Sequence, residues 1–225
     1  MKMDVIYRCC ESEVSPPFKH VRPKWFNKLN CLKTFLKSLE KHESLIDSII
    51  FLHDGVEGEL IKNIPKKYNI ETVNYKSNEK SLLRTFDIAD DLKSDLIYFV
   101  EDDYLHIEDS IKTIFYGAKH LKLVNGYDHL DRYIRNDDIT LNKESITFLN
   151  DTNCHWRTAE STCCTWASTR NMWNNIKDSA RYYKLRDRDF FRNLIKNNIR
   201  LWTPMPGVTT QVDQRLSPGT KWENL

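Results

Sequence analysis

Residues 95–108 read DLIYFVEDDYLHIE, and this stretch decides the fold. Its apolar run, residues 96–100, is rich in aromatic and β-branched side chains, which is typical of a strand buried on both faces. Three carboxylates follow at once: Glu101, Asp102 and Asp103. Because acids crowded at the end of a buried strand repel one another, we expect a divalent cation there, shared with substrate phosphates. A charged turn after a core strand is the simpler alternative.

Strand and helix patterns alternate through the first half of the chain. We predict strands over residues 3–10, 48–55 and 70–76 and helices over residues 25–39, 59–68 and 79–92. This alternation predicts an α/β fold with a mostly parallel central sheet flanked by helices, in which ligands bind at the carboxyl ends of the strands. Neither G-x-G-x-x-G nor a Walker sequence occurs, so we expect a metal and side chains to hold phosphates.

The second half of the chain is less regular. We predict helices over residues 109–121, 171–176 and 189–196, strands over residues 139–141, 145–149 and 161–168, and an ordered loop or tail from residue 203. No internal repeat and no linker interrupts the chain. One domain is therefore predicted over residues 1–225.

Composition indicates an ordinary globular protein with reduced thiols. The 34 basic and 32 acidic side chains leave a net charge of +2, so no strong field calls for nucleic acid or a membrane as partner. The apolar runs are far shorter than the roughly 20 residues of a membrane span, and the first residues lack the organisation of a signal peptide. The six cysteines form neither a zinc spacing nor a disulfide framework, which favours a cytoplasmic enzyme.

Five short motifs follow one another along the chain: EDDYLH (101–106), YDHLDRY (127–133), HWRTAEST (155–162), DRDFF (187–191) and PGVTTQ (206–211). Together with a strand that ends in Asp54, they resemble the GT-A glycosyltransferases, and more narrowly a mostly uncharacterised bacterial and viral subgroup close to family 2. The resemblance covers most of the chain. It implies a single Rossmann-like GT-A domain, with a nucleotide-binding half over residues 1–108 and an acceptor-binding half with a C-terminal loop over residues 109–225.

The resemblance also implies an activity. It predicts a metal-dependent, inverting glycosyltransferase that moves a hexosyl or pentosyl group from a nucleotide diphosphate sugar, with a UDP-sugar expected, to an acceptor hydroxyl. Mn²⁺ or Mg²⁺ is the expected cofactor. In this family the last acid of the motif binds the ion, which assigns Asp103 as metal ligand and places Asp102 near the ribose or a bridging water. Relatives carry a histidine where this chain has Gln211, whose amide oxygen is a weaker ligand, and Asp213 is a nearby substitute.

Four further residues are candidates for binding the donor. Asp54 resembles an acid that contacts the base or ribose, and its alternative role is that of a turn or cap acid. Arg84 resembles a basic residue that reaches the nucleotide, or it is a solvated arginine of a helix face. Arg8 ends the first predicted strand, and Arg157 is placed to reach a phosphate or a sugar hydroxyl.

The catalytic base is expected in the DRDFF motif. The family pattern maps the base onto Asp187, with Asp189 as the second candidate, while capping of the following helix by either acid is the structural alternative. Three residues are acceptor-side candidates: Asp128, His155 and Trp156. The His-Trp pair has packing as its alternative role.

Two other functions stay open. A metal-dependent nucleotidyltransferase uses the same kind of acid cluster, and a non-catalytic domain that binds a sugar nucleotide or a glycan is the third possibility. The sequence does not identify the acceptor, which could be a saccharide, a lipid-linked glycan, a protein or a modified DNA base, nor does it indicate the oligomeric state. Lysines 24, 28, 33 and 37 near the first predicted helix are expected to be solvated.

Overall fold

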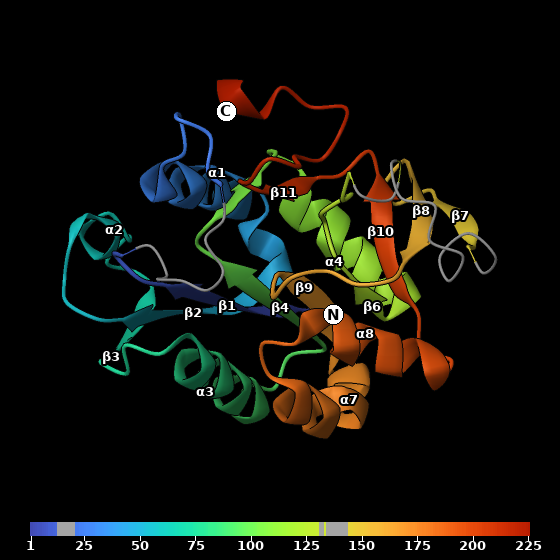
Figure 1. The fold of residues 1–225 in the computed structure, drawn as a ribbon, viewed down its shortest axis with the longest axis horizontal. Helices are drawn as coiled ribbons and strands as arrows, with labels where there is room; N and C mark the ends of the chain where they lie inside the picture. The colour runs from blue at the N-terminus through green and yellow to red at the C-terminus, as the bar shows by residue number, and fades with distance from the viewer. Residues whose placement is uncertain (13–20, 131–132, 134–143) are drawn as a thin grey trace.

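A nine-stranded sheet runs through the centre of the protein (Figure 1). The computed structural model describes residues 1–12, 21–130, 133 and 144–225. In spatial order the strands are β3 (Asn69–Val73), β2 (Ile46–Asp54), β1 (Met3–Cys9), β4 (Leu96–Glu101), β9 (Trp166–Thr169), β6 (Leu123–Val124), β10 (Leu201–Met205), β8 (Cys154–Ala159) and β7 (Ile146–Leu149).

The four strands of the first half of the chain are parallel to one another. Strands of the second half extend this sheet: β9 pairs antiparallel with both β4 and β6, β6 and β10 are parallel, and β8 pairs antiparallel with β10 and β7. The central strands are apolar on both faces because helices cover both faces. In β1, Val5 and Tyr7 belong to one core cluster, whereas Ile6 between them belongs to the other.

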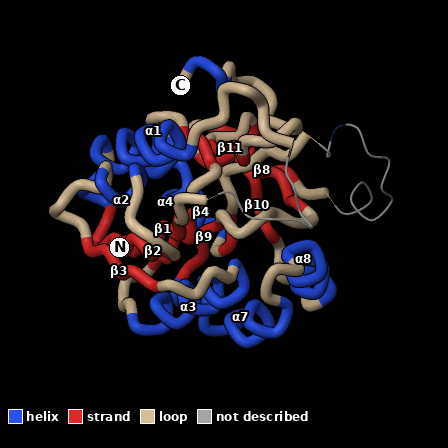
Figure 2. Tube along the Cα trace, turned by 60° about the vertical axis from the view of Figure 1, so that its left-hand side comes forward, coloured by secondary structure: helices blue, strands red, loops and turns tan. Residues whose placement is uncertain are grey.

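Helices form a layer on each face of the sheet (Figures 1 and 2). One face packs against α1 (Lys28–Lys41), α2 (Glu59–Lys62) and α4 (Ser110–Leu121). The opposite face packs against α3 (Asn78–Asp91), α7 (Arg170–Tyr183) and α8 (Asp187–Lys196). A short 3-10 helix, η1 (Glu43–Leu45), precedes β2. The predicted α/β fold, a large central sheet flanked by helices, is confirmed.

A second, two-stranded sheet brings the end of the chain back to the acids. In it, β5 (Tyr104–His106) pairs antiparallel with β11 (Thr209–Gln211), so that Gln211 lies opposite Tyr104. The backbone N–H of Val212 donates to the carbonyl of Asp103 at 2.9 Å. The chain then ends in the 3-10 helix η2 (Trp222–Asn224). This pairing is what positions the C-terminal segment beside the motif at 101–103.

Several predicted elements differ from the structure. The segment from residue 203, predicted as a loop or tail, contains most of β10 and all of β11, and neither β6 nor β8 was predicted. The strand predicted over residues 161–168 occupies Trp166–Thr169, the helix predicted at 171–176 extends over Arg170–Tyr183, and the helix predicted at 59–68 spans only Glu59–Lys62. The strand predicted at 139–141 lies outside the described residues. Among the helices that are described, none combines the length and apolarity needed to cross a membrane.

Candidate functional site

The carboxyl ends of β1 and β4 lie where the chain changes direction across the sheet. From β1 the chain proceeds to β2 and β3 on one side, and it then returns to β4 on the other side. Ligands of open α/β sheets bind in the crevice at such a switch point. Arg8 of β1 and Glu101 of β4 are register partners at this position. The fold therefore places these two charged side chains where a ligand is expected.

Each of the three consecutive acids has its own basic partner. Arg8 Nη2 forms an ion pair with Oε1 of Glu101. Lys28 Nζ lies 3.0 Å from Oδ2 of Asp102, and Arg22 Nη2 lies 2.7 Å from Oδ2 of Asp103. The backbone N–H of Cys10 adds a hydrogen bond of 2.8 Å to the same oxygen of Asp102. The predicted repulsion among the acids is thus offset by the chain's own cations.

Among the described residues, only one of the two carboxylate oxygens of Asp103 has hydrogen-bond partners. Its Oδ2 accepts hydrogen bonds from Arg22 Nη2 at 2.7 Å and from Gln211 Nε2 at 2.9 Å. Its Oδ1 is buried, and no described residue gives it a hydrogen bond. A buried carboxylate oxygen without a partner is costly, and a cation is one group that would satisfy it.

A divalent cation fits this arrangement only in part. Within the described part of the chain, no group of three or more His, Cys, Asp or Glu side chains is arranged to hold a metal ion. Mg²⁺ does not need such a group, because it commonly binds one or two carboxylates together with water and substrate phosphates. The free oxygen of Asp103 is compatible with that kind of site. The amide oxygen of Gln211 accepts a hydrogen bond from the thiol of Cys163 at 3.3 Å.

Burial and like charge raise the pKa of three carboxyl groups at this edge: Glu101, Asp102 and Asp187. Burial, with Asp103 and Asp102 nearby, raises the pKa of Glu101 above its ordinary value even though Arg8 opposes the shift. Burial, followed by the charge of Glu101, raises the pKa of Asp187 to about 8. The thiol of Cys164 donates to Oδ1 of Asp187 at 3.3 Å. The first residue of α8 therefore belongs to the same charged cluster as the end of β4.

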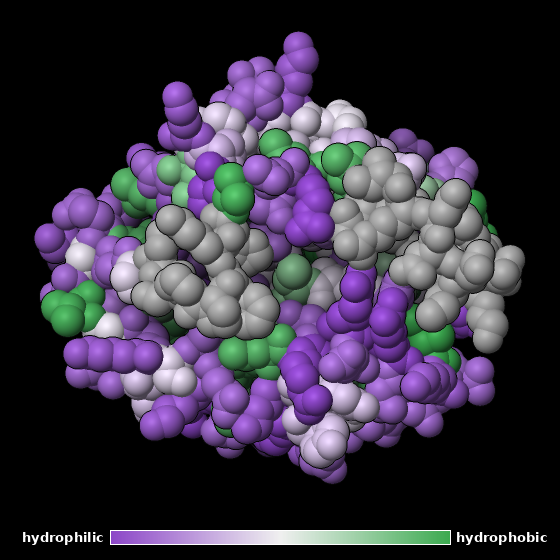
Figure 3. Space-filling model, in the orientation of Figure 1, coloured by the Kyte–Doolittle hydropathy of each residue, from purple (hydrophilic) through white to green (hydrophobic). Residues whose placement is uncertain are grey.

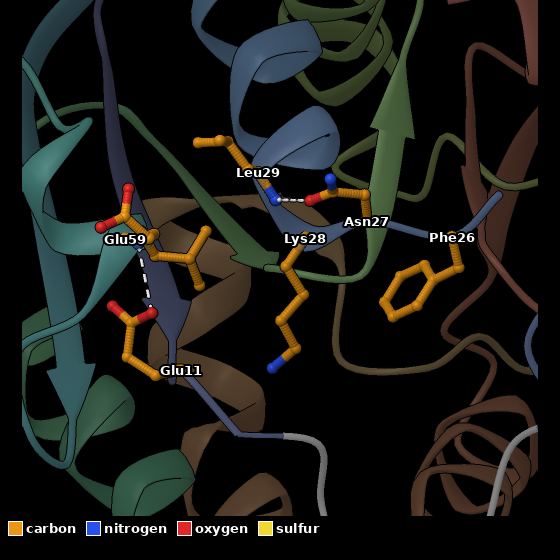
Figure 4. A pocket seen from close by; sticks show the side chains of 7 residues that line it. Glu11, Phe26, Asn27, Lys28, Leu29 and Glu59 are labelled. Atoms are coloured by element: carbon orange, nitrogen blue, oxygen red, sulfur yellow. Dashed lines mark hydrogen bonds between the residues drawn. The ribbon is translucent and has the colours of Figure 1, made fainter.

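A pocket of about 310 Å³ opens beside Lys28 (Figure 4). Figure 4 shows the Lys28 side chain extending between Glu11 and Phe26. Glu11 accepts hydrogen bonds from the backbone N–H groups of Leu60 and Ile61, both at 3.2 Å, at the start of α2. The pocket is lined by seven residues: Glu11, Phe26, Asn27, Lys28, Leu29, Glu59 and Leu60. Its volume lies at the lower end of the range for small-molecule sites.

Two predicted donor residues have other partners. The carboxylate of Asp54 accepts hydrogen bonds from the backbone N–H groups of Tyr75 and Lys76, at 2.8 and 3.1 Å, as a turn acid does. Arg84 makes two hydrogen bonds to Glu71 of β3, at 2.6 and 2.8 Å. The structure brings neither side chain into the cluster at the end of β4.

A buried pair lies in the second half of the sheet. Arg157 of β8 forms an ion pair with Asp128, and both side chains are almost completely buried. The hydroxyl of Tyr133 donates to the other oxygen of Asp128 at 2.6 Å. Asp131 and Arg132 of the YDHLDRY motif lie outside the described residues. The structure thus pairs these two predicted site residues, Arg157 and Asp128, with each other.

The other candidates divide between core and surface. Trp156 is fully buried and packs against Gly117 of α4, where an added Cβ would lie 2.3 Å from the indole ring. His155 is exposed, and its ring lies 5.1 Å from that of Phe148. Asp189 is exposed in the first turn of α8. Asp213 accepts a hydrogen bond of 2.6 Å from the backbone N–H of Arg215.

Sequence reasoning missed two residues of the cluster. Arg22 is not among the predicted site residues, and Lys28 was expected to be a solvated lysine near the first predicted helix. Both side chains are mostly buried at their carboxylate partners. Arg22 is 81 residues from its partner along the chain and Lys28 is 74 residues from its own. No local pattern marks such contacts, although the acids themselves signalled that cations were needed.

The comparisons with known proteins concern the fold. No protein-family model matches the chain, and no curated protein matches it. Among solved structures, 4-diphosphocytidyl-2C-methyl-D-erythritol synthase from Anaerococcus prevotii has a TM-score of 0.51 at 16% identity, over 90% of this chain and 86% of its own. The CMP:2-keto-3-deoxy-manno-octonic acid synthetase complexed with CTP has a TM-score of 0.49 at 10% identity, over 92% of this chain and 93% of its own.

The match to the synthase contradicts the prediction of a glycosyltransferase. The matched protein is by name a synthase of a diphosphocytidyl compound and not a glycosyltransferase, and at 16% identity the likeness concerns the fold. The sequence misled because acids at the carboxyl edge of a parallel sheet indicate a ligand site and do not specify its reaction. Neither manganese nor a UDP-sugar donor has support from the matches.

Proposed function

We propose that this protein is a nucleotidyltransferase, which binds a nucleoside triphosphate and joins its nucleotidyl group to a sugar-type acceptor with release of pyrophosphate. The observation that carries the proposal is the cluster of three basic and three acidic side chains at the β1–β4 switch point. The fold shared with a cytidylyl-compound synthase makes CTP the first nucleotide to test.

The basic side chains are suited to a triphosphate. Arg8, Arg22 and Lys28 converge from β1, the loop before α1 and the start of α1. Charged donors of this kind bind phosphate oxygens strongly, and an arginine does so with two parallel hydrogen bonds. The pocket beside Lys28 offers about 310 Å³ for the rest of the nucleotide. We therefore assign these three residues to the phosphates.

The acidic side chains are assigned to metal binding and to proton transfer. Asp103 and Gln211 would hold Mg²⁺ or Mn²⁺, which when bound neutralises charge on the departing pyrophosphate. Asp187, whose pKa is raised to about 8, is a strong base once it is ionised, so we expect turnover to increase as the pH rises toward 8. We assign it to the acceptor hydroxyl, whose oxygen attacks the α-phosphorus as the bond to pyrophosphate breaks. The acceptor-side role of Asp128 and the donor-binding role of Arg157 remain part of this proposal.

Thermal unfolding with the four common nucleoside triphosphates, each with Mg²⁺, tests the binding step. A nucleotide at about 100 times its Kd adds about 2.7 kcal/mol of stability. For a domain of this size that corresponds to a rise in Tm of roughly 5–10 °C. Sugar nucleotides serve as the comparison set, and a rise only with those contradicts the proposal.

Pyrophosphate release with a panel of sugar phosphates and sugar acids then tests turnover. We expect release to require both CTP, or another triphosphate that binds, and an acceptor. Asp103→Asn is expected to abolish it, since the buried free oxygen is lost as a ligand. Tight nucleotide binding without pyrophosphate release from any acceptor favours a binding module over an enzyme.

A further inference from the structure

The three ion pairs at the switch point leave the cluster electrically balanced. Glu101, Asp102 and Asp103 each have one basic partner, and every one of the six side chains is at least four-fifths buried. Buried charges are stable only while they are paired, because removing one partner leaves the other uncompensated. A phosphate can therefore bind one of these basic side chains, and a metal one of these acids, only if an ion pair opens and both of its members find new partners.

Asp103 shows what such an exchange involves. Its Oδ1 has no hydrogen-bond partner among the described residues, and the residue is 93% buried, with 7% of its surface exposed. Its Oδ2 lies 2.7 Å from the guanidinium of Arg22. A divalent cation that reached Oδ1 would thus lie close to a permanent positive charge, since an arginine does not lose its proton in proteins. Arg22 opposes the metal at the one free ligand oxygen.

We propose that Arg22 gates the cation site at Asp103. The metal binds there only when the guanidinium of Arg22 has left Asp103 and binds the phosphates of a nucleotide instead. This inference rests on the proposed function for its ligand. The phosphates supply the negative charge that Arg22 loses, and the cation supplies the positive charge that Asp103 loses. Metal and nucleotide therefore bind together, and by linkage each raises the affinity for the other by the same factor.

Arg22 is better placed for this exchange than the other two bases. Arg8 lies within β1 and also donates to Ser81 Oγ at 3.1 Å, and Lys28 begins a helix. Arg22 also donates to the carbonyl of Val212 at 2.5 Å. Arg22 precedes α1 in a segment without helix or strand, and it has the most exposed side chain of the three basic residues, at 16%. Its guanidinium lies 4.6 Å from the centre of the Phe26 ring. That ring is also part of the pocket lining, so a guanidinium that left Asp103 would keep an aromatic neighbour beside the nucleotide.

Mn²⁺ binding in the absence of nucleotide tests the gate. The loss of the EPR signal of free Mn²⁺ measures this binding. The wild-type protein is expected to bind Mn²⁺ weakly, and Arg22→Met at least about tenfold more tightly, which is the effect of about 1.4 kcal/mol of removed repulsion. Adding CTP should tighten Mn²⁺ binding in the wild type and have a much smaller effect in Arg22→Met.

Three further variants serve as controls. Arg22→Lys keeps the charge and should bind Mn²⁺ as weakly as the wild type. Arg84→Met removes an arginine that is paired with Glu71 outside the cluster, and should also leave Mn²⁺ binding unchanged. The double variant Arg22→Met/Asp103→Asn should lose the gained affinity. Far-UV circular dichroism and a cooperative thermal transition establish that each variant is folded.

The outcomes separate the gate from the proposed function. Equal Mn²⁺ affinity of the wild type and Arg22→Met, whether tight or weak, overturns the gate. A gain that survives in the double variant also overturns it, because the ion then binds elsewhere. If Arg22→Met gains Mn²⁺ affinity but no triphosphate raises the Tm of the wild type, Arg22 excludes the cation as inferred, while the proposed nucleotide function fails.

Discussion

Asp187 carries the clearest consequence of the site at the level of single residues. Its carboxyl group is desolvated at the start of α8 and faces the charge of Glu101, and together these raise its pKa to about 8. The folded protein therefore holds a proton on this group at pH values where the unfolded chain has released it. Binding more protons in the folded state makes stability fall as pH rises.

Replacing Asp187 with Asn should remove this dependence. Between the pKa of an unfolded aspartate, about 4, and the folded value, the wild type should lose at most about 1.4 kcal/mol per pH unit through this group. Asp187→Asn should match the wild type near pH 5 within about 1–2 kcal/mol and be clearly more stable near pH 8. Urea unfolding at both pH values measures the difference.

Asp189→Asn is the matched control. Asp189 stands two residues later in the same helical turn, but it is exposed, so its variant should follow the pH profile of the wild type. Parallel profiles for Asp187→Asn and the wild type would mean that Asp187 is already ionised in the folded protein, which would contradict its raised pKa.

At the scale of the elements, Asp4 joins the parallel strands at the edge opposite the site. This side chain, 1% exposed, accepts hydrogen bonds from Ser48 of β2 at 2.6 Å and from the backbone and hydroxyl of Ser94, before β4, at 2.9 Å. Arg170, the first residue of α7, lies 3.4 Å from the same carboxylate. One buried acid thus ties β1 to three other elements.

Asp4→Asn should destabilise the fold without affecting the site. The amide loses one acceptor and leaves Arg170 without its charge partner, which should cost about 2 kcal/mol. For a domain of this size the Tm should fall by roughly 4–8 °C. Nucleotide binding below the transition should be unchanged, because Asp4 lies near the amino ends of the strands.

Asp47→Asn provides the comparison. Asp47 is exposed and accepts a hydrogen bond of 3.0 Å from the same Ser94 hydroxyl. An exposed position of this kind should change stability by no more than about 0.5 kcal/mol. Equal losses in the two variants would show that Ser94, and not the buried carboxylate, is the important group.

For the molecule as a whole, the end of the chain closes the structure over the site. Trp222 is 1% exposed and packs in a small core with Cys31 of α1, Leu105 of β5 and Val212. Its indole N–H donates to the carbonyl of Ser217 at 2.7 Å. This cluster supports β11, and β11 in turn carries Gln211 to Asp103.

Trp222→Ala should therefore weaken both the fold and the site. Removing a fully buried tryptophan costs about 3–5 kcal/mol, so the midpoint of urea unfolding should fall strongly. Trp25→Ala is the control, since that tryptophan is 37% exposed. Trp222→Phe should recover part of the loss. A stability loss in Trp222→Ala no larger than that in Trp25→Ala would contradict a structural role for the C-terminal segment.

Figure 3 shows a surface that is mostly hydrophilic on the face drawn, with hydrophobic residues in separate small patches. The charged cluster is largely hidden from such a view, because its side chains are mostly buried. The charge of the site therefore comes from side chains that are buried at the edge of the sheet, and not from the charge of the surface in general.

The α/β class follows from the amino-acid sequence alone, which also predicts the position of the candidate site. Both depend on local patterns: alternating strand and helix periodicity in the first half, and three acids directly after a buried strand. Asp102 and Asp103 are predicted as site residues in this way. The resemblance to the GT-A glycosyltransferases reached a related fold, but its prediction of a glycosyltransferase is wrong, because local motifs indicate a ligand site and do not specify its reaction.

Only the tertiary structure decided what neutralises the acids. Arg22 and Lys28 meet their carboxylates across 81 and 74 residues, and Gln211 reaches Asp103 across 108 residues through the pairing of β5 with β11. Strands β8 and β10 likewise depend on each other over long range. Such contacts are set by how elements pack, and packing leaves no periodic signal in the chain. Whether an acid binds a metal or an arginine is therefore decided by the fold around it.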